Sequence, residues 1–263
     1  MTLKIALISL DQKWEDKAYN MQRCAKLAAR AAACDADLVI FPEMTLTGFT
    51  MNTQLSAEDP EQSSTLNAFG ALAKEHGISL VVGLAVSNGS KAANTLVAFS
   101  DEGTEQARYV KIHPFSLAGE DRFFQRGDKL AKMQMPEFLL GFSICYDLRF
   151  PELYSALAKD CDVLVNIANW PKRRAMHWRT LLQARAIENQ VFVVGVNRTG
   201  MDGNGLEHER SSVVVNANGE FVEPIFTKGE MDIYEISRKE LMDFRQGFST
   251  RQDRLPDLYR VLI

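Results

Sequence analysis

Three side chains that could carry out acyl-transfer chemistry each stand where an apolar stretch of the sequence ends. They are Glu43, Lys111 and Cys145, and each follows a run with the composition of a buried strand. Open α/β sheets tend to gather their reactive groups at the carboxyl ends of strands. If these three strands are neighbours in one sheet, the three side chains converge at its carboxyl edge.

The three residue types form a complete set for attack on a carbonyl carbon. A free thiol titrates near ~8.5, so Cys145 needs a group that removes its proton. Glu43 is the candidate base, and burial would raise its own pKa toward that task. Lys111 is the candidate cation that stabilises a thiolate and an oxyanion.

Each of the three also has a plain structural interpretation. Glu43 could be a surface or helix-start carboxylate, Lys111 an ordinary lysine at a strand end, and Cys145 a buried core thiol. Free cysteines are among the most buried residue types, so the last alternative carries weight.

Composition predicts one large globular domain that spans residues 1–263, with 46% hydrophobic and 24% charged residues. A net charge of -4 gives no basic footprint for nucleic acid and no polybasic patch for a membrane. No HExxH, metal-ligand spacing, P-loop or GxGxxG pattern occurs, so no metal and no cofactor are expected.

The four cysteines, Cys24, Cys34, Cys145 and Cys161, form no CxxC pair. A disulfide framework is therefore not expected, and a cytoplasmic location is predicted. The start of the chain has no signal-peptide pattern, and no apolar stretch is long enough to cross a bilayer. Cys24, Cys34 and Cys161 are interpreted as core or helix-face residues.

Strand and helix patterns alternate along the chain, which predicts an α/β fold with strands buried on both faces. The expected strands are 5–10, 37–42, 78–86, 95–99, 107–112, 130–135, 138–144, 163–167, 192–196, 212–216, 220–224 and 231–236. The expected helices are 17–33, 62–76 (closed by Gly77), 152–158, 175–189 and 238–245. Residues beyond 245 are expected to be polar and irregular.

Three segments together resemble the nitrilase, or carbon–nitrogen hydrolase, superfamily. They are 41–48, which holds Phe-Pro-Glu and Thr-Gly, 109–113, Tyr-Val-Lys-Ile-His, and 144–152, Ile-Cys-Tyr-Asp-Leu-Arg-Phe-Pro-Glu. They occur in the family's order, and the resemblance covers nearly the whole chain. It implies a four-layer α-β-β-α sandwich, a small-molecule amide substrate, and a homodimer formed through the helices after the cysteine and after the next strand.

The resemblance also implies roles for individual residues. Glu43 corresponds to the general base, Lys111 to the oxyanion stabiliser and Cys145 to the nucleophile. The family often adds a second glutamate between the lysine and the cysteine, and Glu120 is the candidate here. Its alternative interpretation is a solvated loop acid.

The residues after the cysteine narrow the resemblance. Tyr146 and Asp147 are similar to the amidase branches, and segments 166–171, 183–190 and 197–205 look most like the bacterial omega-amidases. That branch hydrolyses the terminal amide of 2-oxoglutaramate and related ω-amides. Residues 208–212 depart from the expected aromatic-Xaa-Gly-Asp-Ser pattern, which leaves the preferred substrate open.

Substrate-binding residues are predicted from their place after the strand ends. Tyr146 adjoins the nucleophile and offers its backbone N–H, while Asn169 and Trp170 follow the next strand. Arg173 is the candidate cation for a substrate carboxylate, with its neighbour Arg174 as a second possibility.

Arg149 is interpreted as part of a structural ion network with Asp147 and Glu152. His113 and His177 are interpreted as structural. Three alternatives remain open: another branch of the superfamily (deaminated-glutathione amidase, carbamoyl-amine hydrolase or nitrilase), a Cys–His hydrolase that uses His177, and a non-catalytic binding protein.

Overall fold

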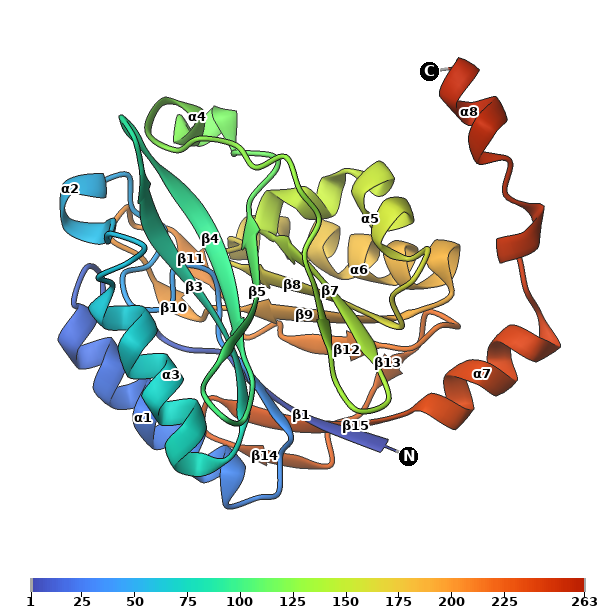
Figure 1. Cartoon of the computed structure of the whole chain (residues 1–263), viewed down its shortest axis with the longest axis horizontal. Coiled ribbons are helices and arrows are strands. Elements are labelled where there is room, and N and C mark those ends of the chain that lie inside the picture. Colours follow the sequence, from blue (N-terminus) through green and yellow to red (C-terminus); the bar gives the residue numbers. More distant parts are fainter. Residues whose placement is uncertain (1, 263) are drawn as a thin grey trace.

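Two β-sheets pack face to face between outer layers of helices in the computed structural model, which describes residues 2–262 (Figure 1). One sheet has the strand order β14-β15-β1-β2-β3-β4-β5 and the other β13-β12-β9-β8-β7-β6. Helices α1 and α3 cover the first sheet, and α5 and α6 cover the second (Figure 1). The predicted α-β-β-α sandwich is confirmed.

Most strands lie where the sequence pattern predicts them, but β4 begins at Lys91 instead of residue 95, and β10, β11 and β14 were not predicted. The first sheet consists of β1 Thr2–Ile8, β2 Leu38–Ile40, β3 Ser79–Asn88, β4 Lys91–Phe99, β5 Glu105–Val110, β14 Phe226–Lys228 and β15 Met231–Ser237. The second consists of β6 Lys132–Gln134, β7 Leu139–Ile144, β8 Val163–Ala168, β9 Phe192–Asn197, β12 Val213–Val215 and β13 Phe221–Val222. Strands β10 Gly200–Met201 and β11 Glu207–His208 form a separate pair.

The helices include three short ones that the sequence pattern did not predict, α2, α4 and α8. The full set is α1 Lys17–Ala32, α2 Thr53–Ser56, α3 Ser64–His76, α4 Glu120–Phe123, α5 Pro151–Leu157, α6 Ala175–Asn189, α7 Arg238–Gly247 and α8 Pro256–Leu262. Single 3₁₀ turns span Ser116–Ala118, Cys145–Arg149, Lys172–Arg174 and Arg251–Asp253. No helix among residues 2–262 combines the length and apolar character needed to cross a membrane.

The four layers follow from strands that are apolar on both faces. In β1, Ile5 and Leu7 join the core between the sheets, while Ala6 and Ile8 pack toward α1 and α3. Successive side chains of a strand point to opposite faces, so a run without polar alternation must be covered twice. The second sheet repeats this arrangement against α5 and α6.

Local signals explain where several helices begin and end. Asp16 caps α1 by accepting a hydrogen bond from the Tyr19 N–H, and Ser63 caps α3 in the same way. Gly77 ends α3 at φ +59°, the left-handed conformation that glycine adopts without strain. The expectation of an irregular C-terminal stretch is wrong at α8, where Pro256 takes the first helical position, which its fixed φ favours.

The reactive strand ends do not belong to one sheet. Strands β2 and β5 lie in the first sheet and point the same way, whereas β7 lies in the second. Glu43 and Lys111 therefore meet Cys145 across the sandwich. Gly83 in β3 permits a close approach, because a Cβ there would lie 2.6 Å from the Met44 nitrogen and 3.0 Å from the Glu43 Cα.

Candidate active site

Cys145 stands on a sharp turn between β7 and α5. Its φ of +46° is unusual for a residue with a side chain and indicates local strain of about 1–3 kcal/mol. The Asp147 carboxylate holds this turn by accepting a hydrogen bond of 3.0 Å from the Ile144 N–H. The turn lifts the thiol out of the sheet, as nucleophile turns do in other hydrolase folds.

Lys111 lies between two carboxylates in the interior. Its Nζ is 3.1 Å from Glu43 Oε1 and 2.8 Å from Glu120 Oε2, and all three side chains are at most 1% exposed. Asn94 Nδ2 donates to both glutamates at 2.8 Å, and the Asn169 N–H donates to Glu43 Oε2 at 2.9 Å. Glu120 is therefore a member of this buried cluster and not a solvated loop acid.

Two residues that support the cluster were missed by the sequence analysis. Asn94 is a polar residue inside the apolar strand β4, a signal that could have identified it. Gln12 donates from Nε2 to the carbonyl oxygens of Glu43, Met44 and Thr45, and so holds the turn that carries Glu43.

The buried charges set the protonation of the thiol. Burial alone would lower the pKa of Lys111, but Glu120 and Glu43 raise it above its ordinary value, so the ammonium stays charged. Burial raises the pKa of Cys145 well above its usual range, Glu43 and Glu120 add to this, and Lys111 opposes it. These surroundings favour the neutral thiol over the thiolate.

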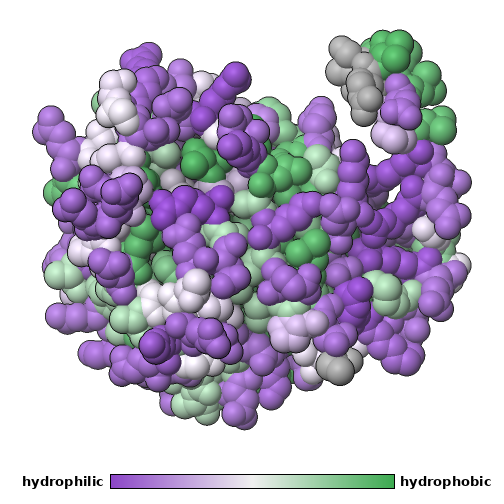
Figure 2. Space-filling view, viewed as in Figure 1, coloured by the Kyte–Doolittle hydropathy of each residue, from purple (hydrophilic) through white to green (hydrophobic). Residues whose placement is uncertain are grey.

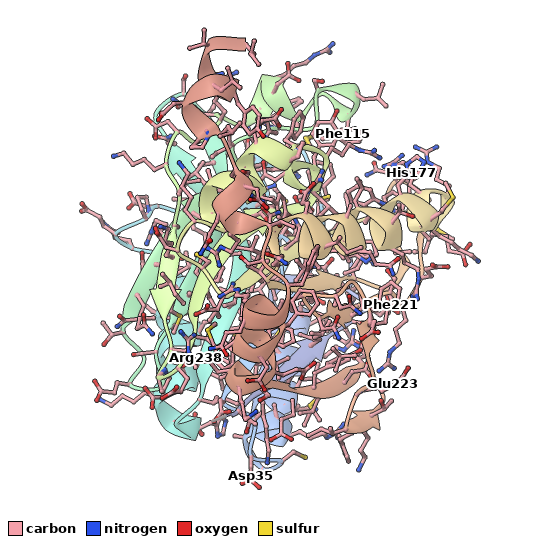
Figure 3. All side chains as sticks on the ribbon, turned by 90° about the vertical axis from the view of Figure 1, so that its right-hand side faces the viewer. Asp35, Phe115, His177, Phe221, Glu223 and Arg238 are labelled. Carbon is pink, nitrogen blue, oxygen red and sulfur yellow. The ribbon has the colours of Figure 1, made fainter. Side chains whose placement is uncertain are left out.

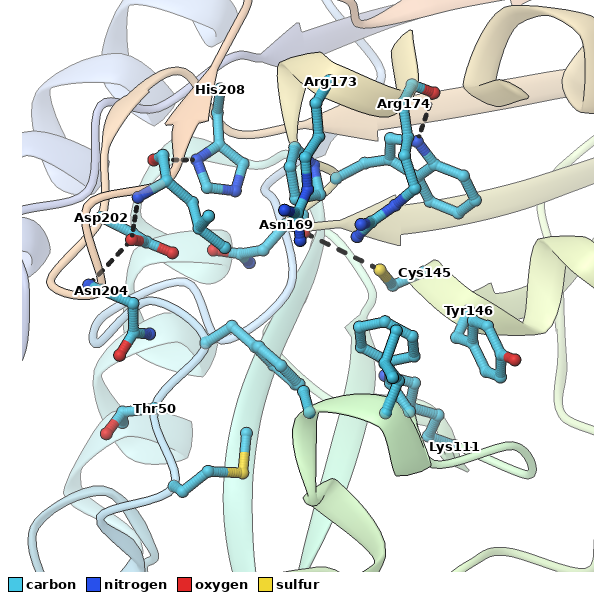
Figure 4. Close-up of a pocket in the computed structure, with 18 of the residues that line it drawn as sticks. Thr50, Lys111, Cys145, Tyr146, Asn169, Arg173, Arg174, Asp202, Asn204 and His208 are labelled. Atoms are coloured by element: carbon cyan, nitrogen blue, oxygen red, sulfur yellow. Dashed lines mark hydrogen bonds between the residues drawn. The ribbon is translucent and has the colours of Figure 1, made fainter. Parts of the chain in front are cut away.

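A cavity of about 480 Å³ opens above the thiol (Figure 4). Its floor includes Cys145 and the backbone of Asn169, whose carbonyl oxygen lies 4.0 Å from the sulfur. The predicted residues that line it are Lys111, Cys145, Tyr146, Asn169, Trp170 and Arg173. Glu43 and Glu120 lie behind Lys111, to which both are bonded.

Arg173 and its neighbour Arg174 both face this cavity. Arg174 is half-buried, and the close-up shows its guanidinium and that of Arg173 pointing toward the space above Cys145 (Figure 4). Burial lowers the pKa of Arg174, and the neighbouring Arg173 and Arg149 lower it further while Cys145 opposes them.

The interpretation of Arg149 as part of an ion network is wrong. Its guanidinium lies over the rings of Trp170 (4.9 Å) and Tyr146 (5.9 Å), where it lines the cavity. Asp147 turns into the interior and bonds to other partners, and Glu152 is exposed. The two acids are thus unable to hold Arg149 away from the cavity.

His113, His177 and His208 occupy different positions around the site. His113 stacks on Phe150 at 3.7 Å and bonds to Asp147 through Nδ1, as expected of a structural residue. His177 is exposed and contacts Arg149 Nη2, which gives no support to a Cys–His pair. His208 lines the cavity with Asp202 and Asn204 from the glycine-rich loop, so the segment that departs from the family pattern does reach the pocket (Figure 4).

The cavity lies at one end of the sandwich. Phe115, which lines it, and His177 both sit at the upper end in the side view, and Asp35, which precedes β2, sits at the lower end (Figure 3). No group of three or more His, Cys, Asp or Glu side chains suited to a metal ion occurs among the described residues.

Comparison with known proteins identifies the family to which this protein belongs. The sequence model of the carbon–nitrogen hydrolase family matches residues 4–246, and the chain belongs to that family. It is an enzyme that hydrolyses carbon–nitrogen bonds, with the cysteine-based site of an amidase.

Individual relatives lie at about 30% identity. The chain is 31% identical to omega-amidase YafV of Escherichia coli (strain K12), with 95% of this chain and 96% of that protein covered. It is 33% identical to 2-oxoglutaramate amidase of Paenarthrobacter nicotinovorans, with 85% and 80% covered. The crystal structure of XC1258 from Xanthomonas campestris, a CN-hydrolase superfamily protein with an arsenic adduct in its active site, superimposes with a TM-score of 0.90 at 29% identity, covering 97% of this chain and 98% of that one.

The electrostatics of the cluster predict how the thiol responds to loss of a carboxylate. Glu120 raises the pKa of Cys145, so Glu120→Gln lowers that pKa and increases the thiolate fraction at pH 8. We expect faster alkylation of Cys145 by iodoacetamide, measured by peptide mass spectrometry. The exposed Glu102→Gln serves as the matched control. An unchanged or slower rate in Glu120→Gln would contradict this account of the thiol.

Proposed function

We propose that the enzyme is an omega-amidase that hydrolyses the terminal amide of small ω-amido dicarboxylates, such as 2-oxoglutaramate and succinamate, to the acid and ammonia. The observation that carries this proposal is the group of three guanidiniums, Arg149, Arg173 and Arg174, on the cavity wall beside Cys145. Arg149 contacts His177 and the rings of Trp170 and Tyr146, and Arg174 lies over the Phe115 ring at 5.5 Å. A substrate carboxylate would meet this charge with charge-assisted hydrogen bonds.

The first half of the proposed reaction forms a thioester. Glu43 takes the proton of Cys145, and the sulfur attacks the amide carbonyl carbon. Lys111 and the backbone N–H of Tyr146 stabilise the resulting oxyanion. The C–N bond then breaks as Glu43 returns the proton to the nitrogen, and ammonia leaves.

The second half regenerates the thiol. Glu43 removes a proton from water, positioned with the help of Glu120, and the oxygen attacks the thioester carbonyl. The C–S bond breaks, the sulfur takes the proton from Glu43, and the carboxylic acid leaves. The whole cycle consumes one water and uses side chains and backbone alone.

A second branch of the family is favoured by the apolar side of the cavity. Phe49, Phe115, Leu117 and Leu206 line it and would accept an amide with a bulkier body. A deaminated-glutathione amidase fits that feature. The other two branches can be told apart by their reactions. Carbamoyl-amine hydrolases release carbon dioxide as well as ammonia, and nitrilases use nitriles as substrates.

Ammonia release from 2-oxoglutaramate and succinamate tests the proposed reaction, beside a panel of larger amides, nitriles and carbamoyl amines. We expect turnover of the ω-amides that is abolished in Cys145→Ala and Glu43→Gln. Lys111→Ala should lower kcat by about 10²–10³-fold, the usual cost of one oxyanion donor. Turnover of other compounds only would reject the substrate. Full activity of Cys145→Ala would reject the mechanism.

The arginine group predicts a selectivity that can be measured separately from chemistry. Arg149→Gln and Arg174→Gln should raise KM for succinamate about 10- to 100-fold, since each removes a charged hydrogen bond. Butanamide, which has the same length without the carboxylate, should be little affected. Arg179→Gln, an α6 arginine that packs on Phe221, is the control. Equal effects on both amides would exclude carboxylate recognition by this group.

We also propose a homodimer that forms through α5 and α6. Met176 and Ile187 on α6 are 71% and 54% exposed, and α8 extends from the body with Leu258, Val261 and Leu262 exposed (Figures 1 and 2). Arg254 anchors this C-terminal segment to Ser155 of α5 and to the carbonyl of Glu188 of α6. Exposed apolar surface of this kind favours association.

Sedimentation equilibrium at micromolar concentration should give twice the mass of one chain. Met176→Lys and Ile187→Lys should shift the protein toward single chains, because a lysine cannot bury its charge in an apolar contact. A single-chain mass for the unaltered protein would rule the dimer out.

The free state of all four cysteines fits the predicted cytoplasmic location, which cell fractionation would check.

A further inference from the structure

The carboxylate of Asp147 joins the two halves of the active site. Asp147 is fully buried. Its Oδ2 accepts from the Tyr109 hydroxyl at 2.7 Å and from the Ile144 N–H at 3.0 Å. Its Oδ1 accepts from the His113 N–H at 3.0 Å and contacts His113 Nδ1 at 2.8 Å.

The partners of this carboxylate bracket the two reactive residues in the sequence. Tyr109 and His113 lie two positions before and after Lys111, and Ile144 directly precedes Cys145. We infer that Asp147 is a positioning residue that fixes the spacing between Lys111 and Cys145 across the sandwich.

The fold supplies a reason for such a link. Lys111 follows β5 of the first sheet and Cys145 follows β7 of the second, so no backbone ladder connects them. Apolar packing between the sheets is non-directional and leaves small relative shifts possible. An oxyanion donor must lie within about 2.7–3.1 Å of the developing charge, so such shifts matter for the reaction.

The hydrogen bonds of Asp147 have the strength and direction that packing lacks. Four contacts from two segments converge on its two oxygens, and burial makes any lost partner costly. The Tyr109 hydroxyl is itself held in this geometry, because it also accepts from the Ile112 N–H at 3.3 Å. The Lys111 segment is thus tied to the turn of the nucleophile at three points.

The inference rests on the proposed roles of Lys111 and Cys145, and its test does not require the proposed substrate. Tyr109→Phe removes one hydroxyl and keeps the bond between Asp147 and the Ile144 N–H. Tyr154→Phe is the matched control. Tyr154 of α5 is equally buried, and its hydroxyl bonds to Ser143 of β7 and Asn166 of β8, which both belong to the second sheet.

Succinamate and propionamide are both tried as substrates. Kinetics are then measured with whichever amide the unaltered protein hydrolyses. We expect Tyr109→Phe to lower kcat about tenfold, because misplacement by a fraction of an ångström already slows chemistry, and to leave KM within twofold. Alkylation of Cys145 by iodoacetamide, which needs no oxyanion donor, should stay within twofold. Tyr154→Phe should lower the melting temperature by about as much as Tyr109→Phe does, because each variant loses one buried hydroxyl. It should leave kcat unchanged.

Asp147→Asn gives an independent second variant of the same size. It should lower kcat about 100-fold. The NH2 group of the asparagine is a donor, so it would face an N–H donor where the carboxylate oxygen now accepts a hydrogen bond. Equal kcat values for Tyr109→Phe and Tyr154→Phe would overturn the inference. A loss of activity that appears in KM alone for Tyr109→Phe or Asp147→Asn would overturn it as well.

Discussion

The buried cluster of Glu43, Lys111 and Glu120 is the interaction on which the arrangement of the site depends. Two carboxylates and one ammonium are removed from water, and isolated charges in such surroundings would cost several kcal/mol each. Asn94 and the backbone N–H groups of Asn169 and Phe115 complete the hydrogen bonding of the carboxylates. The cluster therefore exists only where four separate segments meet.

This requirement explains why the site lies at the end of a two-sheet sandwich. The first sheet supplies Glu43, Asn94 and Lys111, and the second supplies Cys145 and Asn169. Neither sheet alone could surround the charges with donors. Burial raises the pKa of the Cys145 thiol above its usual range; Glu43 and Glu120 add to this rise and Lys111 opposes it, so the same three residues also influence the thiol.

Chemistry and recognition are carried by different kinds of structure. The reacting groups stand at strand ends and on a turn held by hydrogen bonds, where their positions are fixed. The cavity walls come from loops, such as the segment that carries Asp202 and His208 and the turn that carries Arg173 and Arg174. Loops tolerate change better than sheets do, so one buried reaction centre can serve different amides in different relatives.

Most of the long strands and helices, and the reactive set, could be predicted from the sequence. Apolar runs on both strand faces indicated a sandwich, Gly77 marked a helix end, and motif order identified Glu43, Lys111 and Cys145. These features are local, since they depend on side-chain period, backbone conformation or neighbouring residues.

The division of the strands between two sheets could not be predicted, because a strand that is apolar on both faces fits either sheet equally well. The directions of Asp147, which points into the interior, and of Arg149, which lines the cavity, also could not be predicted. The same holds for the hydrogen bonds that Asn94 donates to two glutamates. Each of these outcomes depends on partners distant in the sequence. A charged or polar side chain takes the direction in which its hydrogen bonds can be satisfied, and only the assembled fold supplies those partners.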